Sequence, residues 1–169
     1  MARRRTILAV AAAATLFAAG CGPDIDLTKA LEFRVLNSGY FDDGIHDGQT
    51  RLLPQLEFEI HNRSDRPISS VILLLSYYQS DADGEYDSAT QDGIGATAIA
   101  PGESTKPAIV RAPHGYTFPG ARADFFTNSL FRDIVVKVFA KKRGGYMPLG
   151  SFKVERRILE PTGRTPGTQ

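Results

Sequence analysis

The sequence has a single cysteine, no tryptophan and no apolar run long enough to cross a membrane as a helix. One cysteine forms no disulfide within the chain, so the folded part must be stabilised by packing. The stretch Ile7–Ala19 carries no charge, but it is shorter than the ~20 apolar residues that a transmembrane helix needs. The sequence also lacks a Gly-x-Ser-x-Gly nucleophile elbow, a Gly-rich phosphate loop and a His-Glu-x-x-His zinc motif. It therefore predicts no catalytic residue set and no cofactor.

The first 20 residues have the layout of an export signal. Arginines at positions 3–5 form a basic start, the apolar run follows, and small residues precede Cys21. This order is typical of a secretory signal peptide. The segment Ala18-Ala19-Gly20-Cys21 resembles the lipobox of bacterial lipoproteins, with Ala18 at the position where Leu is usual. The resemblance implies that the Cys21 thiol is alkylated by a diacylglycerol and that the chain is cut just before it.

The resemblance also implies a cellular location. Gly22 follows the cysteine, whereas in enteric-type sorting an Asp at this position retains a lipoprotein at the inner membrane. The expected location in a Gram-negative host is therefore the outer membrane, facing the periplasm. Residues 21–30 would form a lipidated tether of at most about 35 Å, so we expect the domain to lie near the bilayer and to have a membrane-proximal protein partner.

Removal of the signal changes the charge balance. Of the 20 Lys and Arg residues, 17 remain against 19 Asp and Glu, which gives the processed chain a net charge of −2. Because nucleic-acid binding depends on clustered cations that neutralise phosphates, this balance indicates no nucleic-acid partner.

The remaining chain has the pattern of an all-β domain. Leu31–Val35 and Leu56–His61 alternate apolar and polar residues, as half-buried strands do. Residues 68–78 are apolar on both parities, which predicts a central strand covered on both faces. Further strands are expected at 97–100, 108–110, 134–139 and within 146–158. We therefore predict an antiparallel β-sandwich of about seven strands over 31–160, with a short helix or loop insertion near 121–130 and a disordered tail at 161–169.

A second resemblance covers residues 53–112. The segments that carry it are Phe58–Asn62, Pro67–Val71, Tyr77-Tyr78, Asp83-Gly84 and Ala100–Ser104. Their order is similar to that of FxLYD-type immunoglobulin-like domains, which are small sandwiches of bacterial envelope proteins. The resemblance implies an immunoglobulin-like fold and an adhesion, interaction or accessory role, and it brings no catalytic residues.

Two acidic segments are candidates for cation binding. Asp42, Asp43, His46 and Asp47 place carboxylates and an imidazole within one short stretch, which suits a hard or borderline cation. The second segment, 81–87, has the alternating acids of a calcium loop but lacks the glycine that such a loop needs at its sixth position. Solvated turns are the competing interpretation of both. A metal-dependent binding or catalytic domain, with calcium as the first candidate, is the alternative function.

The segment 114–131 is unusually aromatic for a region rich in loop residues. Tyr116, Phe118, Phe125 and Phe126 are the candidate partner-binding residues, because contiguous exposed apolar side chains mark interaction sites. Tyr40 and Phe41 are further candidates if the fold brings them near. The competing interpretation is that these rings are buried and close one end of the sandwich.

Overall fold

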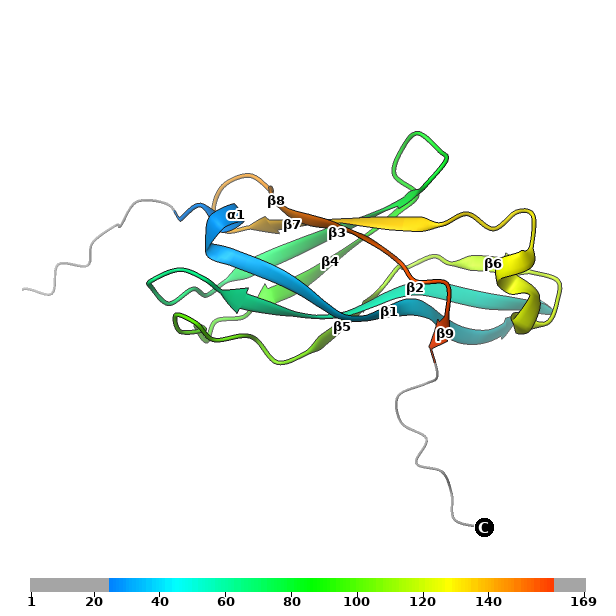
Figure 1. The fold of residues 1–169 in the computed structure, drawn as a ribbon, viewed down its shortest axis with the longest axis horizontal. Coiled ribbons are helices and arrows are strands. Elements are labelled where there is room, and N and C mark those ends of the chain that lie inside the picture. Colours follow the sequence, from blue (N-terminus) through cyan, green and yellow to red (C-terminus); the bar gives the residue numbers. More distant parts are fainter. Residues whose placement is uncertain (1–24, 160–169) are drawn as a thin grey trace, which may run out of the picture.

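Two sheets pack face to face in residues 25–159, the part of the chain that this computed structural model describes (Figure 1). The expected signal peptide, Cys21 and the tail at 161–169 lie outside the described residues. One sheet has five strands in the order β5-β2-β1-β9, with β6 also pairing with β2, and the other has four in the order β4-β3-β7-β8. The predicted all-β sandwich is thus confirmed.

The element bounds follow the chain. The first sheet comprises β1 (Leu31–His46), β2 (Gln49–Asn62), β5 (Ala108–Arg111), β6 (Tyr116–Phe118) and β9 (Ile158–Leu159). The second comprises β3 (Val71–Gln79), β4 (Asp87–Ile94), β7 (Ile134–Lys141) and β8 (Met147–Lys153). A short helix, α1 (Leu27–Ala30), precedes β1, and a 3-10 helix, η1 (Arg122–Thr127), lies between β6 and β7. The helical insertion expected near 121–130 is therefore present.

The strand order is that of an immunoglobulin-like domain. The β1-β2-β5 sheet corresponds to strands A, B and E, and the β3-β7-β8 sheet to strands C, F and G, with β4 as an added edge beside C. The β1–β9 pair is parallel, in contrast to the other strand pairs of the described chain. Through this pair the C-terminal end of the domain joins the first sheet.

The core is built by period-2 alternation. In β7, Ile134, Val136, Val138 and Ala140 are fully buried, as expected for a β-branched strand with one face inward. In β3, one face is buried and the other is covered only in part, because Ser76 on it is 2% exposed whereas Ile72 is 40% exposed. The expectation of a β3 buried on both faces is wrong at this point.

Several boundaries differ from the sequence prediction. The first strand continues to His46 and forms a long hairpin with β2, whose turn places Asp47 and Gly48 at positive φ. Much of the expected acidic loop is therefore the end of this hairpin. The expected strand at 97–100 is reduced to an isolated bridge between Ile68 and Ile99.

Helix α1 belongs to the folded domain. Asp26 caps it by accepting a hydrogen bond at Oδ1 from the Thr28 backbone N–H at 3.1 Å, as N-cap residues do. Leu27 and Ala30 are buried in the core. The expected boundary at residue 31 is therefore too late, because the tether region predicted at 21–30 includes a packed helix. Across residues 25–159, no helix has the length and apolar character needed to span a bilayer.

Candidate functional site

The aromatic residues predicted as a site gather around one buried tyrosine. Tyr40 of β1 lies with its ring centroid 5.4 Å from those of Phe125 and Phe126 and 5.6 Å from that of Phe131, all edge to face. Edge-to-face pairs at such distances stabilise beyond the area that they bury. We call the group of Tyr40, Tyr116, Phe118, Phe125, Phe126 and Phe131 the aromatic cluster. Phe125 and Phe126 belong to η1, which lies at one end of the sandwich (the yellow coil in Figure 1).

Burial separates the members of this cluster. Phe118 and Phe125 are buried, at 7% and 2% exposure, whereas Tyr116 and Phe126 are half-buried. Phe118 and Phe125 therefore offer little free surface, and the exposed face expected from the sequence is not formed by these two rings. Their burial fits the competing interpretation, in which the rings close the end of the sandwich. Partner binding at this end stays a prediction.

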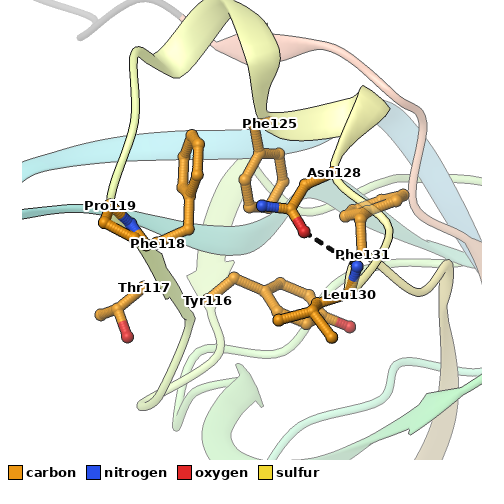
Figure 2. Close-up of a pocket in the computed structure, with 8 residues that line it drawn as sticks. All are labelled: Tyr116, Thr117, Phe118, Pro119, Phe125, Asn128, Leu130 and Phe131. Atoms are coloured by element: carbon orange, nitrogen blue, oxygen red, sulfur yellow. Dashed lines mark hydrogen bonds between the residues drawn. The ribbon is translucent and has the colours of Figure 1, made fainter.

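A pocket opens beside the cluster. Figure 2 shows its lining, which is Tyr116, Thr117, Phe118, Pro119, Phe125, Asn128, Leu130 and Phe131. Asn128 Oδ1 accepts a hydrogen bond from the Leu130 backbone N–H at 2.8 Å and shapes the turn that presents Leu130, which is 78% exposed. The volume is about 80 Å³, well below the range of about 300–1,000 Å³ for small-molecule pockets. Such a pocket suits a small apolar group better than a cofactor.

The tyrosine hydroxyl groups of the aromatic cluster lie within the fold. The Tyr116 hydroxyl donates to the Arg132 carbonyl oxygen at 2.9 Å and accepts from Gln79 Nε2 at 3.2 Å. Burial raises the pKa of Tyr116 to about 12 and also raises the pKa of Tyr40. Both phenols therefore stay protonated near neutral pH and do not act as bases there.

An ion-pair clamp holds the segment that follows the pocket. Asp133 receives two hydrogen bonds from Arg156, Nε to Oδ1 at 2.7 Å and Nη2 to Oδ2 at 3.0 Å, and Lys153 Nζ lies 2.8 Å from Oδ2. The hydrogen bonds from Arg156 lower the pKa of Asp133 to about 2. The Arg156 guanidinium also lies 5.4 Å from the Phe131 ring centroid, so the clamp fixes one side of the aromatic cluster. Neither Arg156 nor Phe131 was among the predicted site residues.

The predicted cation-binding residues are engaged by basic side chains. Asp42 Oδ2 accepts a hydrogen bond from Arg122 Nη1 at 2.9 Å, which ties η1 to β1. Asp43 Oδ2 lies 3.1 Å from Arg51 Nε and 3.0 Å from His46 Nε2. Among the residues that the structure describes, no group of three or more His, Cys, Asp or Glu side chains is arranged to hold a metal ion. The acidic stretch, including the turn residue Asp47, thus contributes to folding of the hairpin.

Phe41 does not join the cluster. Its ring lies under the Arg111 guanidinium, 3.6 Å from ring centroid to Cζ, in a cation–π contact between β1 and β5. The alternation of β1 explains the split, because neighbouring residues of a strand point to opposite faces. Sequence parity places Tyr40 and Phe41 on opposite faces, but the identity of the face that meets η1 depends on tertiary packing.

The fold defines the class of this protein, an all-β immunoglobulin-like sandwich domain. No family model matches the sequence, and no curated protein matches it. Among solved structures, the crystal structure of Bacteroides uniformis β-glucuronidase resembles this chain with a TM-score of 0.41 and 12% sequence identity. The match covers 73% of this chain and 12% of that one, and a likeness this distant carries no argument about activity.

Proposed function

We propose that the chain is a membrane-anchored envelope lipoprotein whose sandwich acts as a non-catalytic binding or assembly-accessory module. The observation that carries the proposal is the position of Cys21, the sole cysteine, directly after a basic and apolar signal-like segment and three small residues. In this proposal Cys21 bears the lipid, and the protein resides at the outer membrane facing the periplasm if the host is Gram-negative. The similarity to FxLYD-type domains supports an interaction role.

The early start of the fold supports a location close to the bilayer. Ile25 already packs against the core, and Leu27 is buried. The link from Cys21 to Ile25 spans at most about 14 Å when fully extended. A lipid on Cys21 would therefore hold the domain against the membrane surface, and the partner would be membrane-bound or membrane-proximal.

The partner would bind at the η1 end of the sandwich. Two large apolar side chains are most exposed there, Ile45 at 77% and Leu130 at 78%, and Leu130 borders the pocket of the aromatic cluster. In the proposal a partner protein covers Leu130 and the half-buried rings of Tyr116 and Phe126, with one aliphatic side chain in the pocket. Phe118 and Phe125 form the pocket wall. Desolvated aromatic contacts of this kind dominate protein interfaces.

Metabolic labelling with an alkyne analogue of palmitate tests the lipidation. Cells that express the full chain should yield a labelled protein in the membrane fraction, and Cys21→Ala should lose both the label and the membrane association. Gly22→Ala is the matched control, because it changes the neighbouring residue and leaves the thiol in place. Labelling that persists in Cys21→Ala would contradict the assignment.

Site-specific photocrosslinking tests the partner surface. A photoreactive residue at position 130 should capture a defined membrane protein in intact cells, and the same residue at position 109 on β5, where Ile109 is 37% exposed, should not. Equal capture from both positions, or no capture from position 130, would contradict a docking role for this end.

A further inference from the structure

The loop that joins β7 to β8 carries three consecutive cations. Lys141, Lys142 and Arg143 precede Gly144 and Gly145, and no acid interrupts the series. Within residues 25–159, Lys142 and Arg143 form no ion pair with a carboxylate. This differs from the η1 end, where arginines are paired with aspartates.

The turn between β7 and β8 does not require the positive charge of Lys142 and Arg143. Arg143 adopts a φ of 63°, a region that favours glycine or asparagine over other residues. Two glycines follow at once, so the chain has residues suited to a turn without an arginine at that position. The side chains of Lys142 and Arg143 are thus available to a ligand outside the domain.

An aromatic residue completes the loop. Tyr146 is 45% exposed, and Lys141 Nζ lies 5.2 Å from its ring centroid. Tyrosine and basic residues together are typical of protein surfaces at the membrane–water interface, where the ring sits at headgroup level. We call residues 141–146 the basic loop.

The basic loop lies at the end of the sandwich where the described chain begins. Helix α1 packs against β8, and the basic loop lies next to α1 in Figure 1. The Arg63 backbone N–H donates to the Ala30 carbonyl oxygen at 2.8 Å and brings the β2–β3 loop to the same end. Arg63 lies at this end near the carboxylate of Glu32, and Lys29 is paired with Asp26 at 3.5 Å, so the unpaired positive charge of this end comes from the basic loop.

We infer that the basic loop docks on the anionic phospholipid headgroups of the bilayer that holds the lipid anchor, and so orients the sandwich with its α1 end toward the membrane. The inference rests on the proposed lipidation of Cys21. The short link to Ile25 keeps the loop within reach of the headgroups. A cluster of cations near a lipid anchor is a second membrane-binding signal, because each cation gains from the negative surface potential. This orientation points the aromatic cluster away from the bilayer, toward a partner.

A fluorophore placed on the loop tests the docking. In a chain whose Cys21 thiol carries lipid, an introduced cysteine is the sole free thiol. Gly144 suits the label because a side chain there meets no atom within 4 Å, and exposed Gln49 at the opposite end is the control position. The lipidated Gly144→Cys and Gln49→Cys proteins are reconstituted in vesicles that contain phosphatidylglycerol and a trace of lipid with a quenching headgroup.

We expect strong quenching at position 144 and weak quenching at position 49. High salt, or replacement of phosphatidylglycerol by phosphatidylcholine, should abolish the difference, because screening removes the attraction. Adding Lys142→Gln and Arg143→Gln should lower the ratio of docked to undocked protein by on the order of 25-fold, about fivefold for each cation. The control, Lys137→Gln, removes an exposed charge from β7 away from the loop and should leave quenching unchanged.

Three outcomes would overturn the inference: equal quenching at the two positions, quenching at position 144 that does not respond to salt or lipid charge, or a loss of quenching in Lys137→Gln as large as that in the Lys142→Gln and Arg143→Gln protein. Failure of lipidation gives a different signature. If Cys21 is a free thiol, the parent protein without an introduced cysteine takes up the fluorophore itself.

Discussion

The two ends of the sandwich differ in how their charges and rings are used. At the η1 end, Asp42 and Asp43 are paired with Arg122 and Arg51, and the aromatic rings pack on Tyr40. At the α1 end, Lys142 and Arg143 have no carboxylate partner among the described residues. Paired charges and buried rings contribute to folding at the η1 end. The proposals above use this contrast, with the membrane at the α1 end and a protein partner at the η1 end.

The largest effect is expected at the centre of the aromatic cluster. Phe125→Ala should lower the free energy of unfolding by about 3–5 kcal/mol, because it leaves a cavity under η1. Chemical denaturation measures this loss in the free energy of unfolding. Phe126→Ala, at a half-buried ring, is the control and should cost clearly less. If Phe125→Ala left stability unchanged, the ring would have to be surface rather than core.

A smaller loss is expected when α1 is unpacked. Leu27→Ala should lower the free energy of unfolding by about 2–3 kcal/mol, since the side chain is 1% exposed. Lys29→Ala on the outer side of the same helix, where the side chain is 85% exposed, should stay within about 0.5 kcal/mol of the parent. Equal, small effects of the two substitutions would mean that α1 belongs to the tether and that the folded domain begins at β1.

How far the sequence predicts this architecture varies with the residues concerned. Strand β7 was predictable because residues 134–139 are the most β-branched run of the chain. Strand β4 was missed, since Asp87–Ile94 consists mostly of small and polar residues whose strand geometry comes from pairing with β3. Helix α1 is too short for a periodic signal, although Asp26 at its N-cap was a readable clue.

The candidate site was predictable in composition but not in exposure. The sequence shows that aromatic residues gather in 114–131. The burial of Phe125 depends on Tyr40, which arrives from a distant strand, and Phe118 packs in turn on Phe125. The ion pairs at the η1 end were likewise not predictable from the local sequence. That Asp42 meets Arg122 follows from the docking of η1 on β1, which local spacing does not encode.

The Asp133 clamp should make the aromatic end sensitive to acid. Because hydrogen bonds from Arg156 lower the pKa of Asp133 to about 2, below the usual value for an aspartate, its carboxylate stabilises the fold above about pH 4, and this contribution is lost as pH falls through about 2. Its cationic partners are exposed to solvent, so Asp133→Asn should cost only about 1 kcal/mol at neutral pH.

Unfolding experiments at several pH values measure this difference. The parent and Asp133→Asn should converge in stability below about pH 2. Asp83→Asn in the exposed β3–β4 loop is the control for loss of a surface carboxylate that has no role in the clamp. A difference that persisted at low pH would mean that Asp133 acts through packing instead of charge.

The smallest effect separates two hydroxyls of the aromatic cluster. The Tyr40 hydroxyl makes no hydrogen bond of normal geometry with the described residues, although the Ile134 backbone lies close to it. Tyr40→Phe should therefore leave stability unchanged or raise it by up to about 1 kcal/mol. Tyr116→Phe keeps its ring but loses the hydrogen bonds with Arg132 and Gln79, and it should cost about 1 kcal/mol. Thermal unfolding of the two variants side by side measures the contrast, and a cost at Tyr40 would reveal a partner for its hydroxyl.

Whether Cys21 is the lipidated first residue is decided by the mass of the N-terminal peptide of the membrane-extracted protein. We expect trypsin to release a peptide spanning residues 21–29 whose cysteine carries a diacylglyceryl group. A chain that retains residues 1–20, or one that begins near residue 21 with an unmodified Cys21 thiol, would contradict it.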